Sequence, residues 1–306
     1  MTAMGNICIT GGAGFIGFNL LKALKSDRAF SVTVIVRSKE SYQKIKDLRI
    51  NCYLDNGNTD ALIQFFLDSK FDSVIHLASH YLKNHKSNEI DSLITSNLLF
   101  GTRLLEATAK SGVKFFVNTG TFWQHYNNQP YSPVNLYAAT KQAFEAIAQY
   151  YRETSDLNFV SIYLNDTYGP GDTRRKILNS WAMMNDSDLM LMSPGNQKIN
   201  LLHINDVVNG FLRLIQMMEN GEFLKNPSCE YSLKAREDIT LRELAALYEK
   251  ISEKKLNIKW GGSPYKAREV MTIWDKDIPL PGWESKICLE EGLREFVSAN
   301  TRGNNS

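Results

Sequence analysis

A glycine-rich run close to the N-terminus constrains the fold of this chain more than any other feature. The run, TGGAGFIG, occupies residues 10–17 of the 306. It follows a short apolar strand predicted at 7–10, and apolar residues then recur at helical spacing over 15–24. A glycine run that ends a strand and opens a helix is typical of a dinucleotide-binding turn, whereas a glycine-rich turn elsewhere would carry no function. The sequence therefore predicts nucleotide binding here.

Each position of this run has a physical role in holding a cofactor. Gly11 permits the tight turn, Gly14 lets the backbone approach a pyrophosphate, and Gly17 allows the helix to pack closely on the strand. Phe15 and Ile16 begin the helix, whose free N–H groups and positive dipole end favour phosphates. We therefore assign these five residues to cofactor binding.

The rest of the N-terminal half alternates between strand and helix patterns. Further strands are predicted at 31–36, 52–54, 72–77, 114–118 and 159–163, and further helices at 60–68, 90–111 and 137–153. This order favours an α/β fold, a doubly wound parallel Rossmann sheet.

The alternation stops after Tyr168, and short elements with turn residues follow. We expect a Rossmann domain over 1–168 and a smaller C-terminal substrate lobe over 169–306. Within that lobe, residues 199–218 are expected to return to the Rossmann sheet. An amphipathic helix is predicted near 240–251, with Thr240 and Glu243 as a capping box.

The end of the second predicted strand indicates which dinucleotide binds. NAD-binding domains usually carry an acidic residue there, which accepts a hydrogen bond from the ribose 2′-OH. This chain has Arg37 and Ser38 instead, and its first carboxylate comes at Glu40. A guanidinium suits a 2′-phosphate, although Arg37 could also be a solvated charge at a strand end. NADP(H) is therefore favoured over NAD(H).

Composition excludes several classes of protein. With 35 basic and 33 acidic residues the net charge is +2, which does not indicate a nucleic-acid partner. The chain has no apolar run of about 18 residues, so no membrane span is expected, and its first residues do not resemble a signal peptide. The four cysteines form no CxxC pair and are expected to be reduced in the cytoplasm. The five histidines show no metal-ligand spacing, so no metal site is expected.

A tyrosine and a lysine four residues apart are the strongest candidates for chemistry. Tyr137 and Lys141 share one face of a predicted helix. A nearby cation lowers the pKa of a phenol from about 10, so Tyr137 could exchange a proton with a sugar-type oxygen near neutral pH. Thr119 ends the fifth strand, at the edge where such sheets bind ligands. The alternative is an ordinary exposed pair, because the YxxxK pattern is common.

Several further motifs occur in a familiar order along the chain. They are TGGAGFIG, VIHLAS at 74–79, Asn97 with GT at 101–102, FFVNTGTF at 115–122, YAATK at 137–141, TYGPGD at 167–172 and LLHINDVVNGF at 201–211. Together with the helix near 240–251 they resemble the extended short-chain dehydrogenase/reductase family of nucleotide-sugar epimerases, dehydratases and reductases. The resemblance covers nearly the whole chain.

The resemblance implies roles for individual residues. Thr119, Tyr137 and Lys141 would form the catalytic triad. Further cofactor contacts would come from Asp55 at the adenine, from Leu77 and Ala78 along the cofactor, and from Asn97, which would support the active-site helix. Tyr137 and Lys141 would also touch the cofactor. Family members commonly form homodimers, here through the helices predicted at 90–111 and 137–153.

Departures from the family pattern narrow the reaction. The 4,6-dehydratases carry an Asp-Glu pair after the catalytic Thr, where this chain has Gly120 and Thr121. Epimerases usually have the acidic residue that Arg37 replaces. The chain looks particularly similar to CDP-abequose synthase-like nucleotide-sugar 4-keto-reductases of O-antigen pathways, a reaction that needs one hydride from NADPH and one proton, here from Tyr137. A nucleotide-sugar epimerase that uses NAD and a non-catalytic NADP-sensing protein remain as alternatives.

The substrate side of the site shows further departures. Where family members often have Asn two residues before the Tyr of YGP, this chain has Asp166, next to Asn165. Where an Arg-Asp pair often opens a later strand, it has Ile199 and Asn200, preceded by Lys198. Cations could grip the substrate diphosphate, although each could equally be a solvated surface charge. The predicted substrate-binding residues are Ser79, Tyr81, Thr121, Phe122, Asn165, Asp166, Arg174, Arg175, Lys198 and Arg268.

Overall fold

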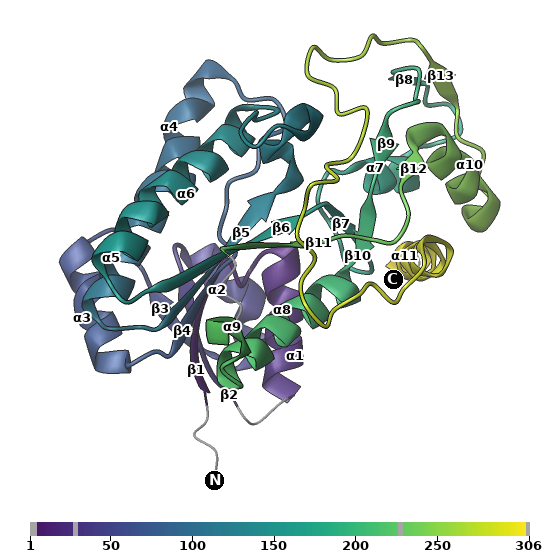
Figure 1. Ribbon diagram of the computed structural model, residues 1–306. Helices are drawn as coiled ribbons and strands as arrows, with labels where there is room; N and C mark the ends of the chain where they lie inside the picture. The colour runs from purple at the N-terminus through teal and green to yellow at the C-terminus, as the bar shows by residue number, and fades with distance from the viewer. Residues whose placement is uncertain (1–4, 27–29, 226–228, 304–306) are drawn as a thin grey trace.

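The larger of two lobes is built on one parallel sheet (Figure 1). The computed structural model describes residues 5–26, 30–225 and 229–303. Seven strands lie in the order β11-β6-β5-β4-β1-β2-β3, and every neighbouring pair is parallel. The strands are β1 (Gly5–Thr10), β2 (Phe30–Val36), β3 (Asn51–Leu54), β4 (Ser73–His76), β5 (Phe115–Thr121), β6 (Asn158–Leu164) and β11 (Glu230–Leu233). The predicted Rossmann fold is confirmed.

Helices cover both faces of this sheet because its strands are apolar on both sides. In β1, Ile7 and Ile9 pack with the helices of one face, while Cys8 packs with those of the other. The first face is covered by α1 (Phe15–Ser26), α2 (Lys39–Ile45), α8 (Ile204–Glu219) and α9 (Glu222–Lys225). The second is covered by α3 (Thr59–Ser69), α5 (Phe100–Lys110) and α6 (Leu136–Thr154).

The long helix predicted over 90–111 is interrupted by a π-helical turn. The chain forms α4 (Ile90–Ile94), a π-helical segment at Thr95–Leu99, and then α5. Such turns are rare and occur frequently at functional sites. This one contains Asn97, which is almost fully buried. Short 3-10 turns form at Lys46–Leu48, Ser87–Glu89, Phe122–Gln124 and Tyr126–Asn128.

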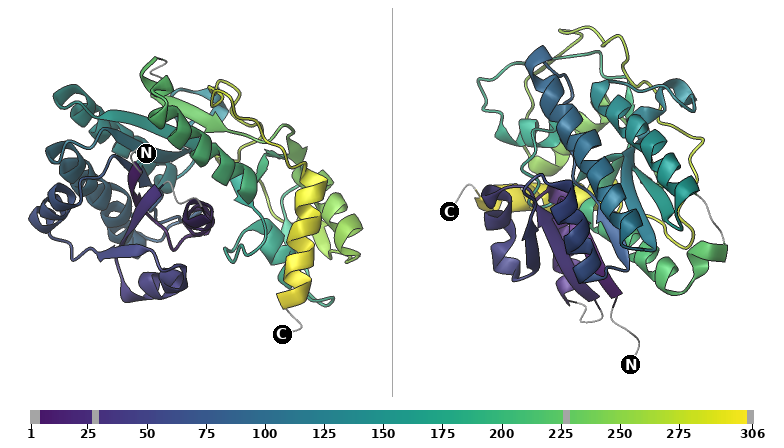
Figure 2. Two further views of the ribbon diagram at one scale, coloured as in Figure 1. Left: turned by 90° about the horizontal axis from the view of Figure 1, so that it is seen from below. Right: turned by 90° about the vertical axis from the view of Figure 1, so that its left-hand side faces the viewer.

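The second lobe packs three helices around a core of its own. These helices are α7 (Ile177–Met183), α10 (Leu241–Ser252) and α11 (Leu289–Gly303), beside the two-stranded ladders of β7 (Asp166–Tyr168) with β10 (Leu201–His203), β9 (Lys198–Ile199) with β12 (Ile239–Thr240), and β8 (Met190–Met192) with β13 (Ile258–Trp260). The core centres on Trp181, Leu244 and Phe296. The predicted capping box opens α10: Thr240 and Glu243 each bond the other's backbone N–H. In Figure 2, left, α11 (yellow) lies within this lobe, on the opposite side of the molecule from the N-terminal strands (purple).

The chain returns to the main sheet later than predicted. Within 199–218, β10 pairs with β7 outside the main sheet, and only α8 returns, packing against α1. The added strand is β11, which pairs with β6. Residues 261–288 then link β13 to α11 as a long segment with little regular structure, and Ile278 accepts a backbone hydrogen bond from Ser232 in β11 (2.7 Å). Both lobes are therefore built from interleaved parts of the chain.

The described ranges contain no helix with the length and apolar character needed to cross a membrane.

Candidate active site

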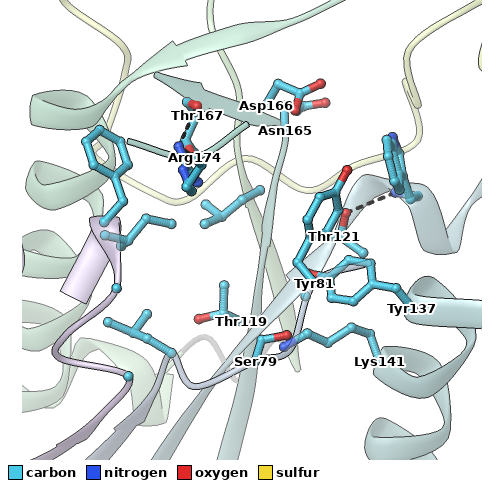
Figure 3. A pocket seen from close by; sticks show the side chains of 18 of the residues that line it. Ser79, Tyr81, Thr119, Thr121, Tyr137, Lys141, Asn165, Asp166, Thr167 and Arg174 are labelled. Atoms are coloured by element: carbon cyan, nitrogen blue, oxygen red, sulfur yellow. Dashed lines mark hydrogen bonds between the residues drawn. The ribbon is translucent and has the colours of Figure 1, made fainter. Parts of the chain in front are cut away.

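A cavity of about 570 Å³ lies at the carboxyl ends of β1, β4, β5 and β6 (Figure 3). Its wall brings together three parts of the chain that are far apart in sequence: the glycine run, the Thr119–Tyr137–Lys141 set, and the start of the second lobe. The predicted site residues on this wall are Gly11, Gly14, Phe15, Ile16, Gly17, Leu77, Ser79, Tyr81, Thr119, Thr121, Phe122, Tyr137, Lys141, Asn165, Asp166, Arg174 and Arg175.

The glycines of the run differ in what surrounds them. Gly11 has a φ of +74°, and a Cβ there would lie 2.5 Å from the backbone N of Ala78. A Cβ on Gly17 would lie 2.3 Å from the carbonyl oxygen of Gly11. A Cβ on Gly14 would meet only that same oxygen, at 3.2 Å. Gly11 and Gly17 are therefore required by internal packing, whereas Gly14 faces the space that a pyrophosphate would need.

The residues predicted to choose the dinucleotide lie outside this cavity. Arg37 is exposed at the end of β2, donates a hydrogen bond to Ser96 (3.0 Å) and lies over the Phe100 ring at 5.2 Å. Ser38 accepts a hydrogen bond from the Ser41 backbone N–H (3.2 Å), so its hydroxyl caps α2. Arg37 keeps further donors for a 2′-phosphate, while the Ser38 hydroxyl already has a structural partner.

The Asp55 carboxylate, predicted to contact the adenine, is already bound by another side chain. Its two carboxylate oxygens accept hydrogen bonds from the Arg103 guanidinium at 2.9 and 3.1 Å. The pair is nearly buried, with 4% of the Asp55 side chain exposed. The role of Asp55 at the adenine stays a prediction.

Asn97 ties the loop after β4 to the helix that carries Tyr137. Its Oδ1 accepts a hydrogen bond from the His80 backbone N–H (2.7 Å), and its Nδ2 donates to the Thr140 hydroxyl (3.0 Å). Ala78 in the same loop is buried against Gly11. Asn97 and Ala78 therefore shape the cavity from behind its wall.

Thr119, Tyr137 and Lys141 face the same cavity, from β5 and α6. The Thr119 hydroxyl is buried and has no hydrogen-bond partner within the described ranges, so it is available to a ligand. The Tyr137 phenol bonds to Ser79, and the Tyr81 ring meets the Tyr137 ring edge-on at 5.0 Å. Thr119, Tyr137 and Tyr81 therefore line one cavity with their hydroxyl-bearing side chains.

The pKa of Tyr137 differs from the sequence expectation. Burial raises it to about 12, and the hydrogen bond to Ser79 and the charge of Arg174 offset this only in part. Burial also lowers the pKa of Lys141 to about 8, which Glu145 opposes. The sequence predicted that Lys141 would lower the pKa of the phenol, but burial raises this pKa, and the groups that oppose burial are Ser79 and Arg174. Tyr137 is therefore a protonated phenol at neutral pH.

Charged side chains from the second lobe line the opposite wall. Asp166 accepts a hydrogen bond from Lys176 (2.8 Å). Burial raises the pKa of Asp166, but Lys176, Lys83 and Arg174 outweigh burial and bring it below its usual value. Of the described residues on the wall, Asp166 alone carries a carboxylate, so the cavity favours an anionic ligand.

Arg174 connects the two lobes. Its guanidinium binds the Asp172 carboxylate through two hydrogen bonds of 2.7 Å, donates to Thr167, and lies 4.4 Å from the centre of the Phe15 ring. Arg175 is exposed beside it on the wall and has no ion pair among the described residues. Arg174 is therefore largely engaged already, and Arg175 is the freer cation.

Two predicted substrate residues lie away from the cavity. Lys198 is exposed on β9. Arg268 donates to the Ser132 hydroxyl (2.7 Å) and lies over the Tyr126 ring at 4.3 Å. The structure thus separates them from the other substrate candidates, because tertiary contacts decide where a long side chain points.

Some residues of the site gave no usable signal in the sequence. Lys83 lines the cavity from a loop whose carbonyl groups are held by Asn135, at 3.0 Å for Lys83. Asn135 also caps α6, because its side chain accepts a hydrogen bond from the Ala138 backbone N–H (2.9 Å). This cap fixes the start of the helix two residues before Tyr137. An isolated loop lysine is indistinguishable in sequence from a solvated charge. Glu145, one helical turn after Lys141, was also missed.

The described ranges contain no group of three or more His, Cys, Asp or Glu side chains that could hold a metal ion.

Comparison with known proteins gives one family and a consistent fold. A model of the NAD dependent epimerase/dehydratase family matches residues 7–225. CDP-abequose synthase of Salmonella typhimurium is 26% identical over 302 residues, which cover 95% of this chain and 97% of that protein. The structure of UDP-glucose 4-epimerase from Thermotoga maritima with UDP-glucose superposes with a TM-score of 0.82 at 19% identity, covering 98% of this chain and 100% of that one. The structure of UDP-glucuronic acid 4-epimerase from Bacillus cereus, in complex with UDP-glucuronic acid and NAD, superposes with a TM-score of 0.79 at 21% identity. The match covers 97% of this chain and 99% of that one.

Proposed function

The chain belongs to the NAD dependent epimerase/dehydratase family, and we propose that it reduces a nucleotide-linked 4-keto-6-deoxy sugar with NADPH. Membership of this family makes the protein an NAD(P)-dependent enzyme of the extended short-chain dehydrogenase/reductase type that modifies a nucleotide sugar. Reduction of a 4-keto-6-deoxy sugar with NADPH is supported by the similarity to CDP-abequose synthase and by the chemistry of the cavity.

The protonated phenol of Tyr137 carries the proposal. Reduction of a ketone needs a proton donor at the oxygen, and Tyr137 holds its proton at neutral pH. It lines the same cavity as the Thr119 hydroxyl, which has no hydrogen-bond partner within the described ranges. Elimination of water would need an acid and a base, but Gly120 and Thr121 stand after Thr119. The single carboxylate on the described wall, Asp166, is paired with Lys176.

These residues define a mechanism. The glycine run and the N-terminus of α1 would hold the dinucleotide phosphates. NADPH supplies the hydride when bound. Thr119 donates a hydrogen bond to the substrate oxygen, Tyr137 gives that oxygen its proton, and the cation of Lys141 balances the phenolate that forms. No second acid–base pair is required.

The test is NADPH oxidation with a panel of 4-keto-6-deoxy sugars carrying CDP, dTDP, GDP or UDP, run beside NADH. Turnover with one nucleotide and a preference for NADPH is the expected result. The rival epimerase draws support from the fold shared with UDP-glucuronic acid 4-epimerase in complex with NAD. Absence of oxidation, with NAD released when the purified protein is denatured, would favour that rival. A sensor would bind NADPH and turn over none of the sugars.

Arg37 is predicted to set the preference for NADPH. Replacing it with Ala should weaken NADPH binding about tenfold to a hundredfold, since hydrogen bonds to charged groups contribute about 1.5–3 kcal/mol. The affinity for NADH should not change. Fluorescence titration of both cofactors measures this, with Lys44→Ala at the far end of α2 as the control. Equal losses for both cofactors would show that Arg37 does not bind a 2′-phosphate.

Arg175 and Arg268 provide a second contrast. We propose that Arg175, on the cavity wall and free of an ion pair among the described residues, helps to hold the substrate diphosphate. Arg175→Ala should raise the KM for the nucleotide sugar about tenfold, the effect of losing one charge-assisted contact. Arg268→Ala should change it less, because Ser132 and Tyr126 hold that side chain elsewhere. A larger effect at Arg268 would indicate that substrate binding moves residues 261–288.

The homodimer and the cytoplasmic location stay predictions from the sequence.

A further inference from the structure

A partly buried carboxylate lies one turn beyond Lys141. Tyr137, Lys141 and Glu145 are spaced by four residues on α6, so they follow one another on the same face of the helix. The mechanism above gives no role to Glu145. Nevertheless its two oxygens lie among polar groups from β6 and from the turn after β5.

Three donors converge on the Glu145 carboxylate. Oε1 accepts from the Ser161 hydroxyl (2.6 Å), and Oε2 accepts from the Tyr163 hydroxyl and from Gln124 Nε2, both at 2.9 Å. The Gln124 amide is fixed in this orientation, because its Oε1 accepts the backbone N–H of Thr121 (2.9 Å). Ser161 Oγ itself accepts from Asn118 (3.0 Å), which leaves its proton for Glu145.

Both oxygens therefore act as acceptors, which is the pattern of an ionised carboxylate. Burial holds the pKa of Glu145 above its usual value, and the three hydrogen bonds offset only part of that rise. The same network holds the turn that follows Thr119, since Gln124 binds both Thr121 and Glu145. Glu145 is thus a fixed negative charge rather than a mobile surface group.

Lys141 needs such a charge. Its side chain is 4% exposed, and none of the described carboxylates pairs with it directly. Glu145 is the group that raises the pKa of Lys141 against the effect of burial. His76 on β4 cannot do so, because burial and Lys141 hold its pKa well below the usual value and keep it neutral.

Other titratable groups near α6 are less suited to supply a negative charge to Lys141. The described parts of β5 and of the turns at Thr95–Leu99 and Phe122–Gln124 contribute none. On α5, Glu106 bonds to Tyr151 and Lys110. On α4, Asp91 is exposed.

Behind Glu145 lies a second carboxylate. Glu230 of β11 accepts a hydrogen bond from the Tyr163 hydroxyl (3.4 Å), and the His125 ring packs against the Tyr163 ring at 5.1 Å. Glu230 raises the pKa of Glu145, so it disfavours the charge that Lys141 needs. Glu145, one turn along α6, is therefore the charged group that favours the Lys141 cation.

We propose that Glu145 is a positioning residue whose hydrogen-bonded carboxylate keeps Lys141 a cation during turnover. Glu145 acts through Lys141 and does not touch the substrate. The expected effect of Glu145 on the pH profile of kcat rests on the proposed function. Its expected effect on stability rests only on the contacts of Glu145.

The kinetic consequence is a change in the alkaline limb of the pH profile. Lys141 must be charged to balance the Tyr137 phenolate, and this charge is lost as pH rises through the pKa of Lys141, which burial lowers to about 8. Glu145→Gln keeps the shape but removes the charge, which lowers that pKa. We expect the alkaline limb of kcat to move about one unit to lower pH, a roughly tenfold loss of rate where the limb descends.

Two further variants separate charge from shape. Glu145→Asp keeps the charge and should restore the position of the limb, even where its shorter side chain lowers kcat at every pH. Glu153→Gln removes an exposed carboxylate two turns further along α6 and should overlay the wild-type profile. An unshifted limb in Glu145→Gln would overturn the proposal.

A second measurement needs no substrate. In Glu145→Gln the Lys141 cation lacks its counter-charge, so its Tm should fall furthest below that of the wild type near pH 7. The deficit should shrink towards pH 10 as Lys141 loses its proton. A deficit that stays constant with pH would mean that Glu145 only packs. If no keto sugar is turned over by the wild type, the proposed function fails, and these melting curves still decide the role of Glu145.

Discussion

Tyr137→Phe is expected to lower kcat for sugar reduction by about a thousandfold and to leave NADPH affinity unchanged. General acid catalysis contributes about 10²–10⁴-fold, and Tyr137 is the group on the cavity wall that we propose gives its proton to the substrate oxygen. The ring of Phe keeps the edge-on contact with Tyr81 at 5.0 Å, so the change removes the proton and little else. Single-turnover NADPH oxidation measures the chemical step, and fluorescence titration measures the cofactor Kd.

Tyr81→Phe is the matched control for this result. Tyr81 also lines the cavity and touches Tyr137, but it is exposed. We expect Tyr81→Phe to retain most of kcat. Full activity of Tyr137→Phe would refute the mechanism, and a Tyr81→Phe loss of the same size would show that the wrong phenol had been chosen.

Gly17→Ala is expected to have the largest effect on stability. Its Cβ would lie 2.3 Å from the carbonyl oxygen of Gly11 and 2.8 Å from the Cα of Gly12, both backbone atoms that cannot rotate away. Overpacking costs about 1–3 kcal/mol or more, which corresponds to a fall in Tm of about 3–10 °C. Because the displaced turn is the one that would hold the pyrophosphate, NADPH binding should be lost as well. Thermal unfolding and NADPH titration of the same samples test both effects.

Gly14→Ala separates packing from ligand contact. Its Cβ would meet one atom, the Gly11 oxygen at 3.2 Å, so Tm should fall by no more than about 3 °C, the equivalent of about 1 kcal/mol. NADPH affinity should nevertheless fall about tenfold or more, because the methyl group would occupy the approach to the phosphates. An equal fall in Tm for Gly14→Ala and Gly17→Ala would contradict the assignment of Gly17 to packing and Gly14 to ligand contact.

The Rossmann fold could be predicted because its signals are local. The glycine run, the apolar strands and the helical spacing each lie within about ten residues. β11 could not be predicted in the same way, because Glu230–Leu233 is short and its place is fixed by pairing with β6, some 70 residues earlier. The π-helical turn around Asn97 has no sequence pattern of its own, since tertiary contacts to His80 and Thr140 hold it.

The residues of the candidate site were predictable where the position of a residue along a strand or helix determines which way its side chain points. Thr119, Tyr137 and Lys141 face one cavity because the ends of β5 and α6 meet there. The long side chains of Lys198 and Arg268 could not be placed, because their partners are chosen by the tertiary fold. The pKa of Tyr137 was misjudged for a related reason: a YxxxK pattern reports the cation but not the burial around it.

The interleaving of the two lobes limits how such an enzyme can be redesigned. Val207, Phe211 and Leu214 of α8 belong to the same core as Ile7 and Ile9 of β1, and β11 covers the edge of β6. A chimera joined at residue 168 would therefore remove one wall of the cofactor half and leave β6 with an open edge prone to aggregation. New substrate specificity would have to be introduced by exchanging residues 169–203 and 234–303 as two separate segments. The second lobe is therefore composed of insertions into the cofactor-binding lobe and is not an independent domain.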